Sequence, residues 1–233
     1  MKFQAIVFSS LALFINAVPV LSAPTGDPAS EPTGEPTSNL LANPEYGPMR
    51  WTGSIEGGPE LDLQGTLQEV LPQILALNPG WEPPLDVANF LAPTKEKAKR
   101  FAPTPTTDNP SLVKRYFKNR PTCNALPGNY AEGWVIEGFA IPWLRVVGEA
   151  GVMCGADPHI CAKSYCEYGS KVELCNDRTT RLEIRCDRLS GAAGEIVKDC
   201  GEFIHGDNRI KGHWWDTTTY AAAVRMSLSG NCL

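Results

Sequence analysis

The placement of the cysteines constrains this chain more than any other feature of its sequence. Eight cysteines are present, and none lies in the first 122 residues. Cys166 and Cys175 stand nine residues apart in the run 164–177, which otherwise has the composition of a β-strand. The other six surround this run, at Cys123, Cys154, Cys161, Cys186, Cys200 and Cys232. The chain therefore divides into a cysteine-free leader and a cysteine-rich core.

The first 22 residues have the pattern of a secretory signal peptide. Lys2 precedes an apolar run from Ala5 to Leu21, and Val20 and Ser22 suit positions −3 and −1 of a cleavage site. Polar residues and a proline interrupt this run, and no other segment approaches the ~18 apolar residues of a membrane span. We therefore expect a soluble product without a membrane span, secreted to the extracellular space or a host apoplast.

Residues 23–115 are predicted to form a largely disordered, Pro-rich propeptide. The stretch begins with Pro, Ser, Thr, Gly and acidic residues, a composition that buries too little apolar surface to offset chain entropy. Residues 61–77 are the exception, because apolar side chains recur there at roughly helical spacing, with Pro72 among them as a helix breaker. We favour a short amphipathic helix in a disordered leader over a docking segment that covers the core before processing.

Two dibasic pairs, Lys99-Arg100 and Lys114-Arg115, lie in polar or Pro-rich surroundings. Lys-Arg is the dipeptide that kexin-type processing proteases cut, and segments of this composition are accessible to proteases. The second pair lies shortly before the first cysteine. We therefore expect a kexin-type protease to cut after Arg115 and to release residues 116–233 as the mature domain.

Charge and cysteine count limit what residues 116–233 can be. They contain 13 Lys and Arg against 14 Asp and Glu, so a basic face for nucleic acid is not expected. In an exported domain, eight cysteines predict four disulfides, each contributing ~2–4 kcal/mol. The count leaves the pairing open. We expect no cofactor.

Two helices are expected in the core from the spacing of its apolar residues. The first covers 134–147, where Pro142 marks a kink or a helix start. The second runs from an N-cap at Ser190 to Cys200. Its glycines and alanines at 191–194 would allow a close approach to a sheet.

Strands are expected at 181–186 and at 220–228, the second with the clearest alternation of apolar and other residues in the chain. Strands that alternate with two helices over this length indicate an α+β fold. The predicted architecture is a small disulfide-stapled antiparallel sheet with two helices, an α/β sandwich, preceded by the largely disordered leader.

The order of these pieces resembles that of the smut-fungus killer toxins. A strand with Cys-x8-Cys corresponds here to YCEYGSKVELC, and a short strand to RLEIRC. A helix that ends in Cys corresponds to LSGAAGEIVKDC, and a final strand that ends in Asn-Cys to AVRMSLSGNC. The chain is also similar to cysteine-rich secreted proteins of filamentous fungi, in which a Cys-Asn-Asp tripeptide follows such a strand, here Cys175-Asn176-Asp177. The likeness covers roughly residues 154–232. It implies an α/β sandwich and a secreted toxin or a host-directed effector with a role in virulence.

One difference limits what this resemblance implies. The killer toxin carries a basic cluster between its two strand cysteines, and this cluster is tied to action on calcium channels. Here the interval contains Lys171 as its only basic residue, with Glu167 and Glu173 on either side. We therefore do not extend the channel activity to this chain.

A metal site is one alternative use of the cysteines. Cys154, His159, Cys161 and Cys166 offer the ligand types that zinc prefers. In an oxidising compartment, however, such thiols are far more often paired as disulfides. We therefore expect no metal.

A ribonuclease-like hydrolase is a second alternative. His213, Glu183 and Arg185 would supply the base, acid and cation that cleavage of a phosphodiester needs. Three scattered histidines without a motif are more often surface residues, so we place catalysis below binding.

The loop between Gly206 and Gly212 and the residues after it are the predicted binding region, because exposed aromatic and basic side chains on loops carry recognition. The candidate residues are Lys211, His213, Trp214 and Trp215, with Lys171 as a weaker addition. The competing interpretation is that one of the two tryptophans fills the core.

The sequence thus predicts a secreted effector or toxin-like protein that binds a host or competitor protein or a cell-surface target. A small secreted hydrolase, most plausibly a ribonuclease, is the second hypothesis. A carbohydrate-binding or cell-wall-binding protein that uses Trp214 and Trp215 is the third.

Overall fold

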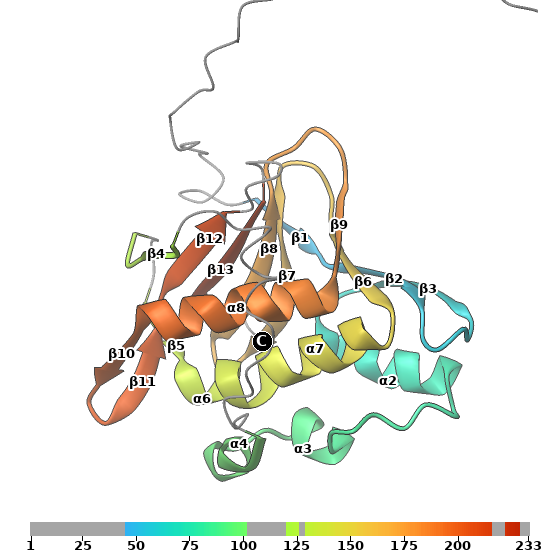
Figure 1. The fold of residues 1–233 in the computed structure, drawn as a ribbon, viewed down its shortest axis with the longest axis horizontal. Coiled ribbons are helices and arrows are strands. Elements are labelled where there is room, and N and C mark those ends of the chain that lie inside the picture. The colour runs from blue at the N-terminus through green and yellow to red at the C-terminus, as the bar shows by residue number, and fades with distance from the viewer. Residues whose placement is uncertain (1–44, 102–119, 126–128, 216–221, 229–233) are drawn as a thin grey trace, which may run out of the picture. The chain divides into compact units, whose positions relative to one another are not determined.

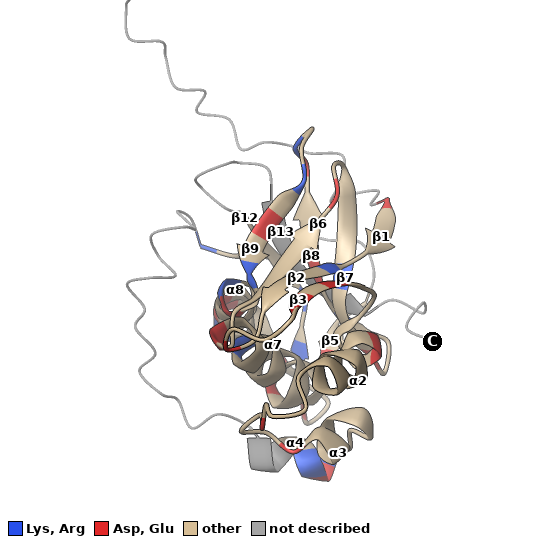
Figure 2. Cartoon of the chain, turned by 90° about the vertical axis from the view of Figure 1, so that its right-hand side faces the viewer, with Lys and Arg blue, Asp and Glu red and all other residues tan. Residues whose placement is uncertain are grey.

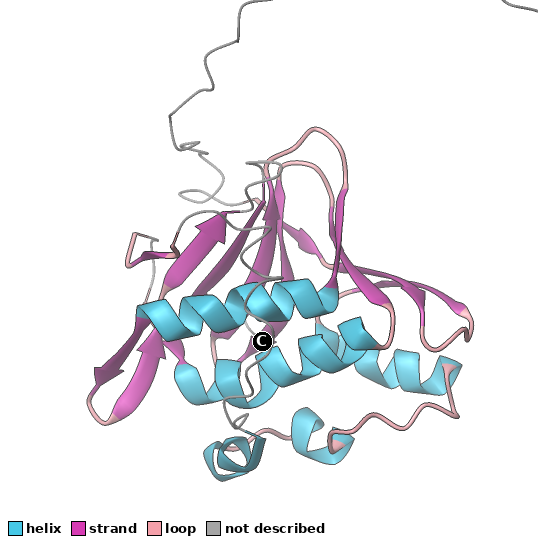
Figure 3. Ribbon diagram, viewed as in Figure 1, coloured by secondary structure: helices cyan, strands magenta, loops and turns pink. Residues whose placement is uncertain are grey.

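The computed structural model describes residues 45–101, 120–125, 129–215 and 222–228 (Figure 1). Their helices and predominantly antiparallel sheets, which alternate along the chain, confirm the predicted α+β class. Figure 3 distinguishes the two kinds of element by colour. Within these residues no helix is long and apolar enough to cross a membrane.

The described strands form three sheets. The six-stranded sheet has the order β1 (Tyr46–Pro48), β7 (Ile160–Glu167), β8 (Ser170–Asn176), β13 (Ala222–Leu228), β12 (Gly212–Trp215) and β4 (Thr122–Cys123). The four-stranded sheet has the order β3 (Glu60–Gln64), β2 (Arg50–Ser54), β6 (Val152–Ala156) and β9 (Leu182–Arg185). The three-stranded sheet has the order β10 (Gly201–Ile204), β11 (Asp207–Ile210) and β5 (Ala131–Glu132). The β1–β7 pair is parallel and the other pairs are antiparallel.

The described helices come from both halves of the chain. They are α2 (Leu67–Leu77), α3 (Val87–Leu91), α4 (Lys95–Phe101), α6 (Gly133–Val135), the π-helical segment η1 (Ile136–Ala140), α7 (Ile141–Glu149) and α8 (Cys186–Cys200). Helices α7 and α8 lie side by side and run across the strands (Figure 1). They are the two helices that the sequence predicts for the core.

The first of these helices changes its winding just before a proline. Residues 133–149 form one continuous helical run, α6–η1–α7, in which the π-helical turn directly precedes Pro142. Proline has no N–H to donate and its ring displaces the carbonyl four residues earlier, so a wider turn is accommodated there. The expectation that Pro142 marks a kink or helix start is confirmed.

Helix α8 begins earlier than the sequence predicts. It starts at Cys186, so Ser190 lies inside the helix, where its hydroxyl donates a 2.8 Å hydrogen bond to the carbonyl of Ile141. The predicted N-cap was therefore wrong. The close approach of the two helices comes from Gly148 on α7, where an added Cβ would lie 1.9 Å from the backbone nitrogen of Asp187. Gly194, in the predicted contact region, has no atom within 4 Å of the corresponding position.

The run from Cys166 to Cys175 is a hairpin and not a single strand. Strands β7 and β8 pair antiparallel across the two-residue turn Tyr168-Gly169, whose φ angles are 47° and 70°. Two positive φ angles are characteristic of the type I′ turn, which matches the twist of a hairpin. The sequence expectation missed the turn because Tyr is an unusual residue at its first position.

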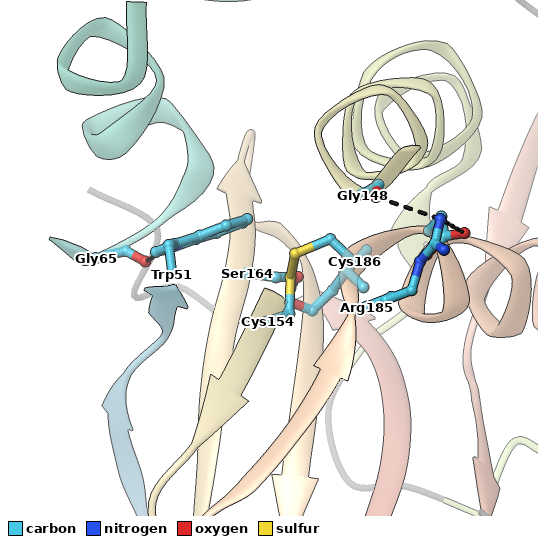
Figure 4. The surroundings of a disulfide bond; sticks show 9 residues. Trp51, Gly65, Gly148, Cys154, Ser164, Arg185 and Cys186 are labelled. Carbon is cyan, nitrogen blue, oxygen red and sulfur yellow. Dashed lines mark hydrogen bonds and ion pairs between the residues drawn. A yellow bond between two sulfur atoms is a disulfide. The ribbon is translucent and has the colours of Figure 1, made fainter. Parts of the chain in front are cut away.

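Three disulfides join elements of the described structure: Cys123–Cys200, Cys154–Cys186 and Cys161–Cys175. The second ties strand β6 to the start of α8 (Figure 4). Cys166 is disulfide-bonded as well, and Cys232 lies outside the described residues. Several disulfides in a domain of this size are typical of proteins of oxidising compartments.

Residues 45–101 correct the prediction of a largely disordered leader. They contribute β1, β2, β3 and three helices, and Trp51 and Phe90 in this segment are at most 1% exposed. The error arose because composition was averaged over residues 23–115, although the apolar residues are concentrated after position 48. Residues 1–44 and 102–119 lie outside the described structure, and with them the signal peptide, Ser22 and the Lys114-Arg115 pair.

The predicted helix at 61–77 is half strand and half helix. Glu60–Gln64 form β3, and α2 begins at Leu67 after Thr66, whose backbone N–H donates a 2.6 Å hydrogen bond to Glu69. Helix α2 continues through Pro72. One face of α2 is fully buried, which agrees with the docking alternative and not with the favoured isolated helix; its residues are Leu67, Val70, Leu71 and Ile74.

We predict that Trp51→Ala lowers the free energy of unfolding by about 3–5 kcal/mol, because the indole is fully buried and donates a 2.8 Å hydrogen bond to the carbonyl of Gly65. Thr52→Ala, at the neighbouring half-buried position, is the matched control and should cost far less. Urea unfolding of the uncut protein measures both. Equal stability of the Trp51 variant and wild type would contradict a structural role for this segment.

We also predict a Cys166–Cys232 disulfide, since Cys232 is the one cysteine left when the three pairs and Cys166 are assigned. Peptide mapping without reduction should yield four linked pairs, and alkylation of the native protein should label no thiol. Recovery of a labelled Cys232 peptide would contradict this assignment.

Candidate functional site

The residues nominated as an exposed binding loop lie mostly in a strand. Gly212–Trp215 form β12, which pairs with β13 on one side and β4 on the other. His213 and Trp214 are buried, whereas Lys211 and Trp215 are half-buried. The prediction of an exposed loop was therefore wrong here, and Trp214 takes the core role that the competing interpretation assigned to one tryptophan. His213 lies edge-on to Trp215, with ring centroids 6.2 Å apart.

Lys171 is also not the surface residue that was predicted. Its side chain is 1% exposed and its ammonium lies 2.7 Å from the carboxylate of Glu173, which is fully buried. The same ammonium donates a 2.8 Å hydrogen bond to the hydroxyl of Tyr46 on β1. Because a buried cation needs compensating partners, Lys171 has a structural position in the sheet.

The ribonuclease-like candidates are distributed over two sheets. His213 lies in β12 of the six-stranded sheet, whereas Glu183 and Arg185 lie on the exposed side of β9 in the four-stranded sheet. The Arg185 guanidinium forms a 2.9 Å ion pair with Asp187. The structure thus does not show these three residues as one catalytic group.

The cysteines of the metal-site alternative are used otherwise. Cys154, Cys161 and Cys166 are all disulfide-bonded, so they carry no thiolate for a metal ion. His159 lies in the turn between β6 and β7, and its side chain is 58% exposed. Among the processing residues, Lys99 and Arg100 lie in the last turn of α4, and their side chains are not described.

The predicted binding loop between Gly206 and Gly212 is strand β11, which forms a hairpin with β10, a strand that was not nominated from the sequence. Helix α8 ends at Cys200 and the chain enters β10 directly at Gly201, with the Cys123–Cys200 disulfide at this junction. His205 and Gly206 form the turn with φ angles of 51° and 86°, again the two positive values of a type I′ turn. The hairpin projects beyond the end of α8 (Figure 1).

Phe203 on this hairpin is 82% exposed, against 41–52% for the other exposed large apolar side chains of the described residues. It lies on β10, an edge strand with one neighbour, so one side of its backbone is not paired within the sheet. A signal for this site was present in the sequence, because Phe-Ile-His-Gly-Asp places a turn-forming glycine next to an aromatic residue.

Polar side chains from four other segments hold the hairpin in place. The amide of Asn124 donates a 2.7 Å hydrogen bond to Glu202. The other three contacts are Lys95 with Asp207, Arg209 with Glu132, and Asn208 with Glu137. Because its base is covalently linked and its flanks are bonded, the hairpin presents Phe203 on a defined support.

The pKa values of two carboxyl groups at the hairpin are shifted in opposite directions. Burial raises the pKa of Glu137, and the hydrogen bond from Asn208 opposes this rise. The hydrogen bond from Lys95 lowers the pKa of Asp207. Figure 2 colours the ribbon by charge and shows acidic and basic residues interspersed along the elements on the face it presents. The arrangement is suited to contact with a partner surface through an aromatic side chain with a polar surround.

Comparisons with protein-family models, curated protein sequences and solved structures gave no match to this chain.

We predict that Glu137→Gln becomes more stable relative to wild type as the pH rises from 4 to 7. A carboxyl group with a raised folded-state pKa contributes stability below its unfolded value, near 4.5, and that contribution is lost as the pH rises through the folded value. Asp207→Asn is the control: its lowered pKa confines its own pH dependence to values below about 3.8. Urea unfolding at several pH values measures both, and a pH-independent Glu137→Gln difference would contradict the assignment.

Proposed function

We propose that this chain is a secreted, toxin-like or effector-like protein that acts by binding a host or competitor target through the β10–β11 hairpin. The observation that carries the proposal is the 82% exposure of Phe203 on a hairpin with a disulfide at its base. Aromatic side chains supply much of the energy of protein recognition when a partner desolvates them.

Three further features support this proposal. The disulfides suit an extracellular protein, because oxidising compartments preserve them. The α+β fold agrees with the architecture that the resemblance to killer toxins implies. The residues of the ribonuclease alternative lie in different sheets, and the nominated Lys171, His213 and Trp214 are buried, which leaves the hairpin as the better candidate for contact.

Secretion through a signal peptide, processing by a kexin-type protease and a role in virulence belong to the same proposal. They rest on the N-terminal apolar run, on the dibasic pairs and on the resemblance. The partner is a protein or cell-surface component with an apolar depression that receives Phe203, because burial of the ring against a flat polar surface would contribute little binding free energy.

We predict that Phe203→Ala weakens binding to target cells at least about tenfold while leaving the melting temperature unchanged, since the ring has few contacts in the folded protein. Fluorescently labelled protein on a panel of fungal and plant cells measures binding, and growth inhibition or tissue damage measures effect. Leu77→Ala on α2, 42% exposed, is the matched control and should behave as wild type.

The Trp215→Ala variant distinguishes binding through the hairpin from binding through the residues nominated from the sequence. If the hairpin is the contact, loss of the half-buried Trp215 should lower stability more than specific binding. Full activity of Phe203→Ala, together with loss of activity at unchanged stability in Trp215→Ala, would move the site to β12 and overturn the hairpin proposal.

A further inference from the structure

Two strands of the cysteine-free segment, residues 45–98, are built into sheets of the cysteine-rich part. Strand β2 pairs with β6 over Arg50–Gly53 and separates it from β3. Strand β1 adds to the edge of the six-stranded sheet by pairing with β7. Without this segment, β6 and β7 would each lose a neighbour, and the four-stranded sheet would be reduced to the β6–β9 pair.

Large aromatic side chains fill the boundary between the two parts. Trp51 lies directly opposite Cys154 in the β2–β6 register, so its indole is on the same sheet face as the Cys154–Cys186 disulfide (Figure 4). Phe90 on α3 packs between Trp143 and Tyr165, with ring centroids 4.8 and 5.8 Å apart. These side chains are all nearly or fully buried.

Close backbone approach and polar contacts continue the boundary beyond the aromatic core. An added Cβ at Gly138 would lie 2.5 Å from the Cβ of Ala98, so η1 and α4 are in direct contact there. Polar contacts across the boundary join Gln68 to the carbonyl of Cys166 at 3.0 Å, Tyr168 to the carbonyl of Pro93 at 3.0 Å, Lys171 to Tyr46 at 2.8 Å and Arg50 to Asp157 at 3.2 Å.

No disulfide can hold residues 45–98 in place, because the first 122 residues contain no cysteine. We propose that a cut between Phe101 and Arg120 leaves a two-chain protein, in which residues 45–98 remain bound non-covalently as a permanent subunit. The inference rests on the proposed function only for the natural occurrence of the cut, at Lys114-Arg115. Processing would then change the connectivity of the protein and not discard its N-terminal segment.

Residues 45–98 should remain bound because their separation from the rest of the protein would expose the hydrophobic core that the two parts share. Phe90 would leave its partners Trp143 and Tyr165 in water, and the fully buried Trp51 would itself become exposed. The β6 edge would lose its backbone hydrogen bonds to β2. Boundaries of this kind resemble obligate subunit interfaces, which are apolar and dissociate only when the subunits unfold. The segment should therefore leave under denaturant and not under dilution.

The test uses the full chain with Lys114-Arg115 replaced by the recognition sequence of a specific protease, so that the cut does not depend on natural processing. After cleavage, denaturing electrophoresis should show two fragments, whereas size exclusion and native mass spectrometry should show one particle down to nanomolar concentration. The uncut form of the same protein is the control for size. Separation of the cut wild-type fragments at micromolar concentration without denaturant would overturn the inference.

Substitutions at the boundary give the second measurement. In the cut protein, Phe90→Ala should raise the dissociation constant of the two fragments at least about a hundredfold, and Leu91→Ala, its 49% exposed neighbour, should leave it unchanged. If the alanine variant fails to fold, Phe90→Leu is measured in its place and should give a smaller rise in the dissociation constant. An unchanged dissociation constant in the Phe90 variants would overturn the role assigned to this boundary.

The natural cut is tested separately by the intact mass of protein from culture medium, with and without denaturation. An uncut secreted chain would contradict the proposed processing. The two-chain inference would then be decided by the experiment with the engineered cut. Residues 116–233 recovered alone in a native, folded particle would overturn the two-chain inference.

Discussion

The antiparallel pairing of β2 with β6 joins the cysteine-free and cysteine-rich parts of this protein, and it places Trp51 opposite Cys154. The Cys154–Cys186 disulfide continues from that point to the start of α8, whose neighbour α7 approaches closely at Gly148. One strand pair therefore connects the N-terminal segment to the helical layer. The disulfides alone cannot define this fold, because they reach only residues after position 122.

Strand β8 is buried along its whole length and includes a pair of charged side chains. The Lys171–Glu173 ion pair lies within β8, and the hydroxyl of Tyr46 from β1 accepts a further hydrogen bond from its ammonium. Removal of one partner from such a pair leaves an uncompensated charge, which costs more than the pair contributes. The three-residue edge strand β1 thus has a role beyond backbone pairing, because it brings the Tyr46 hydroxyl to Lys171.

Helix α4 connects the N-terminal segment to the proposed contact surface. Lys95 on this helix binds Asp207 in the β11 strand, and Ala98 packs against Gly138 in η1. The N-terminal segment therefore supports the hairpin that presents Phe203. A processed protein that lost this segment would lose one of the four polar contacts that hold the hairpin.

The sequence by itself determined the α+β class, the strand at 182–185, the alternating strand at 222–228 and the apolar face of α8, because these depend on local periodicity. The tertiary structure decided which residues are exposed. Lys171 and Trp214 look like surface residues until both faces of their sheet are covered. It also decided that residues 45–101 fold, since their apolar side chains gain stability only against a surface formed by residues far along the chain. Phe203 became a candidate for the opposite reason: the local sequence indicates a turn beside an aromatic residue, but the 82% exposure of the ring follows from where the hairpin projects.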